Sequence, residues 1–90
     1  MKLFWDEHKR LANLEKHSLD FSDVVNFGWD DAIIEPARAG KYGGSRSKAV
    51  GHYLDSAAIV IFSTLGSEAI SIISFRPANK RERRLLDENS

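Results

Sequence analysis

The sequence predicts a small α+β protein, in which an antiparallel meander sheet carries N-terminal helices on one face and is followed by a short C-terminal helix. Consecutive strand patterns are separated by short turns, which favours antiparallel neighbours. The helical patterns stand before and after this run of strands, as in proteins whose helices cover one side of a sheet. The 90 residues are the length of one domain, so we expect residues 1–90 to form a single unit.

The N-terminal part predicts a short strand and two helices. Residues 2–5, Lys-Leu-Phe-Trp, are bulky enough for a strand, and Asp6 offers an N-cap oxygen to a helix over residues 6–17. The apolar stripe of this helix is thin, which predicts a position on a sheet edge. A second short helix begins near Asp20 or Ser22.

The central part predicts four strands, over residues 32–37, 48–54, 57–64 and 69–75. Pro36 is expected to end the first strand, and the glycine-rich stretch 38–47 reads as a loop. The segment AAIVIFST is apolar throughout, so the third of these strands should be covered on both faces of the sheet.

The final helix has a clear start signal. Pro77 ends the last strand, and Asn79 is followed three residues later by Glu82, which is a capping-box pattern. Leu85 and Leu86 should face inward on this helix, with its cations outside.

Composition excludes several classes of protein. The chain has no cysteine, and His8 and His17 lack the spacing of helical metal ligands, so we expect no metal and no cofactor. The first residues do not form a signal-peptide pattern, and the longest apolar run is too short to cross a bilayer. These features predict a soluble cytoplasmic protein without a membrane partner.

The charge distribution is uneven although the formal net charge is zero. Residues 1–36 hold four Lys/Arg and eight Asp/Glu, whereas residues 37–84 hold nine Lys/Arg and three Asp/Glu. This asymmetry suggests that one face of the protein binds an anionic ligand.

Two blocks of the sequence resemble the BrnT toxins. FWDEHKRLANLEKHSLDF shares their Trp-Asp pair, spaced Lys and Asn, and Lys-His before a small residue and a Phe. AIVIFSTLGSEAISIISFRPANKRERRLL shares their apolar strand, Ile-Ser-rich strand, Arg-x-Ala and Glu-Arg-Arg helix. His52 departs from the pattern, because many relatives are expected to carry Arg there.

The resemblance implies a RelE-like fold and a ribonuclease toxin of a type II toxin–antitoxin pair. It also implies a BrnA-like antitoxin, a ribbon-helix-helix protein, with toxin subunits around an antitoxin dimer. DNA would then be contacted only through the antitoxin, and the toxin's own nucleic-acid partner would be its RNA substrate.

Metal-independent RNA cleavage needs proton transfer and stabilisation of negative charge, and the sequence offers candidates for both. Arg76, where a buried strand leaves the sheet, suits a phosphate clamp; His52 suits proton transfer; Lys48 suits a base or a phosphate ligand. Arg83 is the candidate for a second phosphate contact. Further candidate RNA-binding residues are Arg46, Lys41, Lys80 and Arg84.

Each candidate also has a structural interpretation. Arg76 can pair with a surface carboxylate, His52 can be an ordinary half-buried histidine, and the cations of the last helix can form a solvated face. The favoured function is an endoribonuclease that arrests translation and is neutralised by its antitoxin. The alternative is a non-catalytic nucleic-acid- or protein-binding module that uses the basic C-terminal half. Convergence of Arg76, His52 and Lys48 would favour the enzyme.

Overall fold

The structure, a computed structural model, describes residues 1–38 and 45–89. The candidate Lys41 lies outside these described residues. In chain order the elements are β1 (Lys2–Phe4), α1 (Glu7–His17), the 3₁₀ helices η1 (Phe21–Asn26) and η2 (Trp29–Asp31), β2 (Ile33–Ala37), β3 (Arg46–Tyr53), β4 (Ser56–Leu65), β5 (Ala69–Pro77) and α2 (Lys80–Glu88). The fold is a small α+β fold, as predicted.

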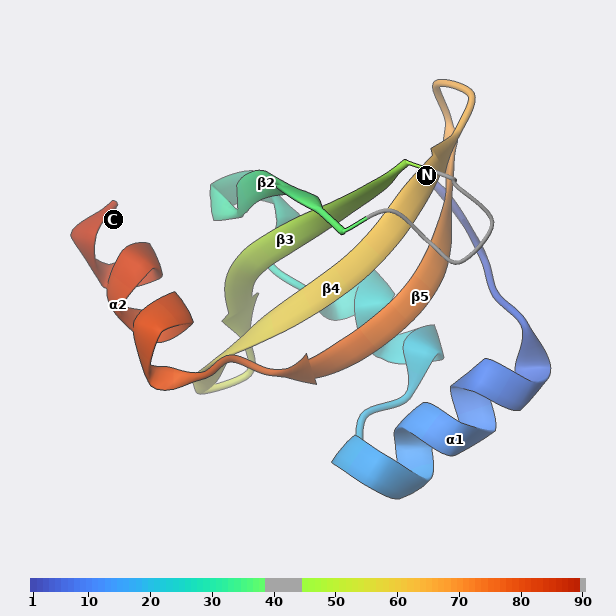
Figure 1. The fold of residues 1–90 in the computed structure, drawn as a ribbon, viewed down its shortest axis with the longest axis horizontal. Helices are drawn as coiled ribbons and strands as arrows, with labels where there is room; N and C mark the ends of the chain where they lie inside the picture. Colours follow the sequence, from blue (N-terminus) through green and yellow to red (C-terminus); the bar gives the residue numbers. More distant parts are fainter. Residues whose placement is uncertain (39–44, 90) are drawn as a thin grey trace.

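The strands form one mixed sheet in the order β1-β5-β4-β3-β2. Strands β2 to β5 are the predicted antiparallel meander (Figure 1). The expectation of a wholly antiparallel sheet is wrong at one edge, because β1 pairs parallel with β5. The α1–η1–η2 segment separates β1 from the meander in sequence, so no turn signal between neighbouring strands indicated this pairing. The RelE-like relationship stays a prediction.

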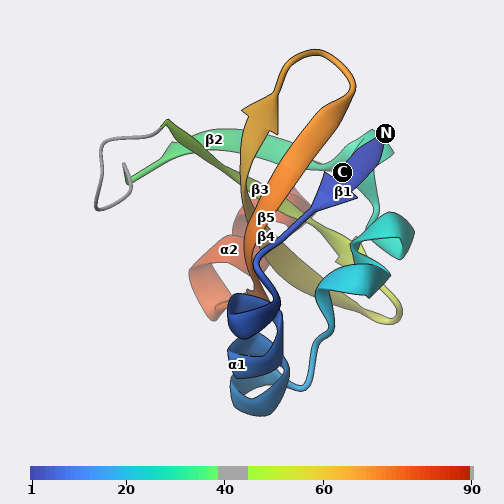
Figure 2. The same ribbon diagram turned by 90° about the vertical axis from the view of Figure 1, so that its right-hand side faces the viewer.

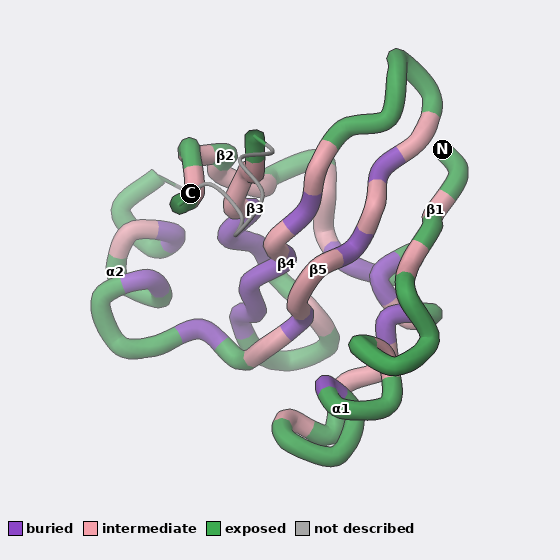
Figure 3. The backbone as a smooth tube through the Cα atoms, turned by 45° about the vertical axis from the view of Figure 1, so that its right-hand side comes forward, coloured by how far each residue is buried: buried purple, intermediate pink, exposed green. Residues whose placement is uncertain are grey.

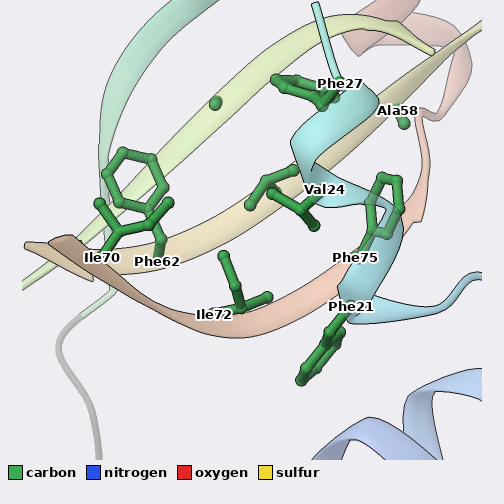
Figure 4. Packing of buried hydrophobic residues seen from close by; sticks show 10 residues of the cluster. Phe21, Val24, Phe27, Ala58, Phe62, Ile70, Ile72 and Phe75 are labelled. Carbon is green, nitrogen blue, oxygen red and sulfur yellow. The ribbon is translucent and has the colours of Figure 1, made fainter. Parts of the chain in front are cut away.

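One face of the sheet carries the larger core, which η1 and η2 cover (Figure 4). The second predicted helix is present as the 3₁₀ helix η1, and η2, which was not predicted, follows after Gly28. Phe21, Val24 and Phe27 pack against the sheet, where Phe75 is fully buried. Gly51 makes room for this packing, because a Cβ atom there would lie 2.6 Å from the Phe27 ring. The aromatic side chains of this region are thus core residues.

The opposite face carries a smaller core beneath α2. Leu86 packs there with Val50, Ala57 and Ile59. Because Ala58 and Val60 belong to the other core, β4 is covered on both faces, as its apolar sequence predicted. α2 consequently lies on the sheet face opposite η1 and η2.

Strand β2 departs from the sequence-based expectation at Pro36. The strand continues through Pro36 to Ala37. Proline is tolerated here because β2 is an edge strand of the sheet. An edge strand has a neighbour on one side alone, so the missing N–H of Pro36 need not remove a hydrogen bond between strands.

Helix α1 lies against β5 and is held there by polar contacts rather than by an apolar stripe. β1 pairs with β5 at Ala69–Ser71, and in the described chain no strand continues along that edge. Figure 2 shows β1 leading into α1 beside the sheet, and Figure 3 shows how much of α1 is exposed. The buried residue of α1 is Asn13, which is 8% exposed.

The Asn13 amide takes the place of a missing strand neighbour. Its Nδ2 donates to the Phe75 carbonyl at 2.7 Å, and its Oδ1 accepts from the Phe75 N–H at 3.1 Å. Nδ2 also donates to the Leu19 carbonyl at 2.9 Å. One side chain thus satisfies both backbone groups of Phe75 and closes the sheet edge just before Arg76.

Replacing Asn13 by Leu should lower the free energy of unfolding by about 2–3 kcal/mol, because buried backbone groups of Phe75 would lose their partners. Urea unfolding of the variant measures this loss. Glu15→Ala, an exposed change on the same helix, should stay within about 0.5 kcal/mol of the original protein. Equal midpoints for the two variants would contradict the edge-closing role of Asn13.

Candidate active site

The start of α2 fixes a buried carboxylate against the sheet. The predicted capping box is confirmed: Asn79 Oδ1 accepts from the Glu82 N–H at 2.8 Å, and Glu82 Oε1 accepts from the Asn79 N–H at 2.8 Å. The side chain of Glu82 is only 2% exposed. A carboxylate buried to this degree requires charged or hydrogen-bonding partners.

Arg76 is the first of these partners. Its Nη1 donates to Glu82 Oε1 and its Nη2 donates to Glu82 Oε2, both at 2.9 Å. Nη1 also donates to the Pro77 carbonyl at 3.2 Å. The sequence also allowed Arg76 to pair with a surface carboxylate. Arg76 does pair with a carboxylate, but that of Glu82 is buried. Hydrogen bonding to Glu82 raises the pKa of Arg76.

Lys48 is the second partner, and it reaches Glu82 from β3. Its Nζ donates to Glu82 Oε2 at 2.9 Å and lies 3.8 Å from an oxygen of Glu35, the residue opposite it on β2. Arg76 and Lys48 are 30% and 15% exposed, so both cations are held between the protein and solvent. The structure therefore brings Arg76 and Lys48 together around one carboxylate.

The surrounding charges keep this carboxylate ionised. Hydrogen bonding from Arg76 is the main effect that lowers the pKa of Glu82 to about 2, against the opposing effect of burial, with further contributions from the Asn79 N–H and Lys48. An anion with so low a pKa is a poor proton acceptor near neutral pH. Glu82 can therefore hold cations in place but is unsuited to acid–base catalysis.

The guanidinium of Arg76 keeps one bidentate edge available. Glu82 occupies the end-on edge formed by Nη1 and Nη2. The remaining donors are the Nε–H and the second Nη2–H, for which the described residues offer no hydrogen-bond acceptor. These two N–H groups point in parallel, which is the arrangement that matches two oxygens of a phosphate.

His52 and Arg83 form a separate group. They line a pocket of about 270 Å³ with Asp55, Ser56, Ala57, Leu86 and Asp87. Arg83 Nη1 donates to the Ala78 carbonyl at 3.1 Å, and His52 is exposed.

Helix α2 packs on β3 between Lys48 and His52. Val50 lies between Lys48 and His52 on β3 and packs in the core beneath α2 with Leu86. The four residues from Lys48 to His52 correspond to about 13 Å along the strand. Lys48 and His52 thus lie apart along β3, and the convergence of Arg76, His52 and Lys48 considered from the sequence stays a prediction.

The other candidate cations are distributed around these two groups. Arg46 begins β3 and lines a shallow pocket with Ile34 and Ser45, and Lys80 and Arg84 are exposed on α2. All three are available to a long polyanion without forming a defined site of their own.

Sequence reasoning missed two residues near Arg76. The sequence predicts Glu82 only as a capping residue. Its position as the single acid among the five cations of residues 76–84 was a signal that it pairs with some of them. His17, half-buried at the end of α1, lies one helical turn after Asn13. Burial lowers the pKa of His17, and the charges of Lys16 and Arg76 lower it further. His17 is therefore within electrostatic reach of Arg76.

The described residues hold neither a metal-binding cluster nor a membrane-spanning helix. No cluster of three His, Cys, Asp or Glu side chains suited to a metal ion occurs among them. None of the helices in the described part of the chain is long and apolar enough to span a membrane.

The depressed pKa of Glu82 predicts a pH-dependent stability. Since the folded value of about 2 lies below the ordinary 4.5, the stabilisation is complete well above pH 4.5 and is lost as pH falls through 4.5 toward 2. Between about pH 6 and pH 3, the difference in free energy of unfolding between the original protein and Glu82→Gln should shrink by about 2 kcal/mol. Denaturant unfolding at each pH measures it, with exposed Glu15→Gln as the control. A constant difference would refute the prediction.

Comparisons with known proteins agree with the resemblance seen in the sequence. The model of a family described as ribonuclease toxin, BrnT, of type II toxin–antitoxin systems matches residues 5–82. The 1.1 Å crystal structure of the Brucella abortus ribonuclease toxin BrnT is similar at 40% sequence identity and a TM-score of 0.71. That match covers 89% of this chain and 99% of the Brucella chain.

A comparison with curated proteins found no match. The family match nevertheless extends over most of the chain, from the residue after β1 to Glu82 itself, and the solved structure shares the fold over a similar span. The chain therefore belongs to the BrnT family of ribonuclease toxins of type II toxin–antitoxin systems.

Proposed function

We propose that this protein is a metal-independent endoribonuclease whose active site is centred on Arg76 and Lys48. The observation that carries the proposal is the available edge of the Arg76 guanidinium, held rigidly by a buried carboxylate next to a second cation. Membership of a ribonuclease toxin family favours this function over the alternative of a non-catalytic binding module.

The reaction requires charge stabilisation and two proton transfers. The 2′-hydroxyl of a nucleotide attacks the adjacent phosphorus, the bond to the 5′-oxygen breaks, and a cyclic phosphate forms. One group removes the proton of the 2′-hydroxyl and another protonates the leaving oxygen. Negative charge grows on the phosphate oxygens meanwhile, so fixed cations lower the barrier without a metal ion.

Arg76 and Lys48 supply the charge stabilisation in this proposal. The side-on edge of Arg76 binds two phosphate oxygens, and Lys48 adds a positive charge nearby. Lys48 is paired with Glu82 and lies beside Glu35, and in this proposal its role is to contact phosphate.

The proton-transfer group is a histidine in this proposal. His52, the candidate from the sequence, shares its pocket with Arg83 on the other flank of α2. An RNA strand that contacts both groups must therefore pass over α2, where Lys80 and Arg84 are exposed. His17 is the second histidine to test, because it lies in the electrostatic field of Arg76.

In the cell, this activity would arrest translation by degrading RNA, and a BrnA-like ribbon-helix-helix antitoxin would neutralise it. Family membership implies an antitoxin protein and an RNA substrate. We further propose that toxin subunits flank an antitoxin dimer and that the antitoxin makes the DNA contacts. Cations exposed on α2, such as Lys80 and Arg84, suit contact with an acidic antitoxin segment.

Purified protein should cut a defined RNA in the presence of EDTA. In single-turnover assays, Arg76→Ala should slow cleavage about a hundredfold, since one lost donor to the growing charge costs about 2–4 kcal/mol of barrier. Arg81→Ala removes an exposed cation of the nearby helix α2 and should change the rate less than threefold. Equal rates for the two variants would refute the Arg76 assignment, and cleavage that EDTA abolishes and a divalent ion restores would refute the metal-free mechanism.

The same assay separates the histidines. His52→Ala should lower the rate and alter its pH profile near neutrality if this imidazole transfers a proton. Exposed His8→Ala on α1 is the matched control and should leave the profile unchanged. If His17→Ala changes the profile while His52→Ala does not, proton transfer belongs to the end of α1 instead.

Expression of this chain alone should arrest growth, and co-expression of the antitoxin encoded beside it should relieve the arrest. The affinity of the purified pair should fall with rising salt, because a cationic surface dominates the proposed contact. Salt-insensitive binding would indicate an apolar interface instead. DNA binding by the toxin alone at physiological salt would contradict the assignment of DNA contacts to the antitoxin.

A further inference from the structure

We propose that Glu82 is a positioning residue for RNA cleavage: it bridges β5 and β3 through Arg76 and Lys48 and holds both cations in the geometry that a phosphate requires. This inference rests on the proposed function of that pair. It assigns no contact with RNA to Glu82 itself.

The hydrogen-bond inventory of Glu82 supports a role in orientation. Oε1 accepts from the Asn79 N–H and Arg76 Nη1, and Oε2 accepts from Arg76 Nη2 and Lys48 Nζ, at distances of 2.8–2.9 Å. The four principal acceptor positions of an ionised carboxylate are thus filled. No position remains for a substrate hydroxyl.

The two cations come from strands that are not neighbours. Arg76 is on β5 and Lys48 is on β3, and β4 runs between them, so their backbones are about 10 Å apart. Both side chains are long and flexible, with about 2 kcal/mol of rotamer entropy each in solution. The carboxylate of Glu82, which α2 holds against the sheet, binds both side chains and restricts their conformations before RNA binds. Preorganisation of this kind raises catalytic rates.

The negative charge of Glu82 makes it possible to distinguish a role in positioning the cations from a role in attracting RNA. Glu82 is negative and lies beside the phosphate-binding cations, so it weakens the overall attraction for a polyanion. Its removal should leave RNA binding as tight or tighter. The rate of the bound complex should fall, because Arg76 loses its bidentate partner and Lys48 loses its nearest carboxylate.

Glu82→Gln is the decisive variant. A glutamine at the third helical position can still accept from the Asn79 N–H, as Gln does in capping boxes. Its amide nitrogen would face the donors Arg76 Nη2 and Lys48 Nζ, so the bidentate pairing could not persist. We expect at least a tenfold lower single-turnover rate at saturating protein, with the dissociation constant for RNA unchanged or lower.

Asn79→Ala is the matched control for helix stability. It removes the acceptor for the Glu82 N–H and should cost about 1 kcal/mol of stability, while the contacts of Glu82 with Arg76 and Lys48 remain. Under conditions where thermal melts show both variants folded, Asn79→Ala should cut within threefold of the original rate. If Glu82→Gln also cuts within threefold, Glu82 is only a capping residue and the inference fails.

Two further variants complete the experiment. Glu82→Asp keeps the negative charge, but its side chain is too short to hold both cations and the cap. The cleavage rate of this variant should therefore also fall at least tenfold. If Glu82→Gln does not fold, an unchanged rate in Glu82→Asp would overturn the inference. In an Arg76→Ala background, Glu82→Gln should cause a clearly smaller fold loss than it causes alone, since part of its effect acts through Arg76 and only the part through Lys48 remains. Additive losses would contradict positioning. An Arg76→Ala variant that cuts normally would instead refute the proposed function itself.

Discussion

The buried ion cluster of Glu82, Arg76 and Lys48 is the interaction on which the functional half of this protein depends. An isolated carboxylate could not be buried at the base of α2, because the loss of hydration would cost several kcal/mol. Two cations and a backbone N–H offset this cost. The cluster thereby connects the start of α2 to two strands of the sheet and places a cationic edge at the surface.

The opposite side of β5 depends on a second polar contact. Asn13 closes the edge that β1 leaves uncovered, so α1 can dock although Leu11 and Leu14 are exposed. Phe75 is therefore fixed from the edge by Asn13 and from the core by its aromatic neighbours. Arg76 follows Phe75 directly, so its backbone is held on a rigid element, as the role proposed for Arg76 requires.

The position of α2 determines how the cations are divided. Its sheet-facing side carries Glu82 and Leu86, while Arg83 lines the pocket of His52 on one flank. Arg76 and Lys48 thus belong to one group of residues and Arg83 belongs to another. The cluster of Glu82, Arg76, Lys48 and Glu35 has no net charge, so in the proposed function long-range attraction of RNA depends on exposed cations such as Lys80 and Arg84. In the proposed function, Arg76 and Lys48 thus orient the phosphate, whereas other, exposed cations attract the RNA.

The sequence by itself determined the local features and the family. The spacing of Asn79 and Glu82 predicts the capping box. The continuous apolar pattern of β4 predicts that both of its faces are covered. The thin apolar stripe of α1 predicts its position at the sheet edge. The tertiary structure decided which side chains meet. Glu82 is 34 residues from Lys48 in sequence, and their contact depends on strand order and on the direction in which α2 crosses the sheet. The parallel pairing of β1 with β5 depends on the same long-range arrangement. Local patterns specify the state of a segment, but packing of distant segments specifies its neighbours.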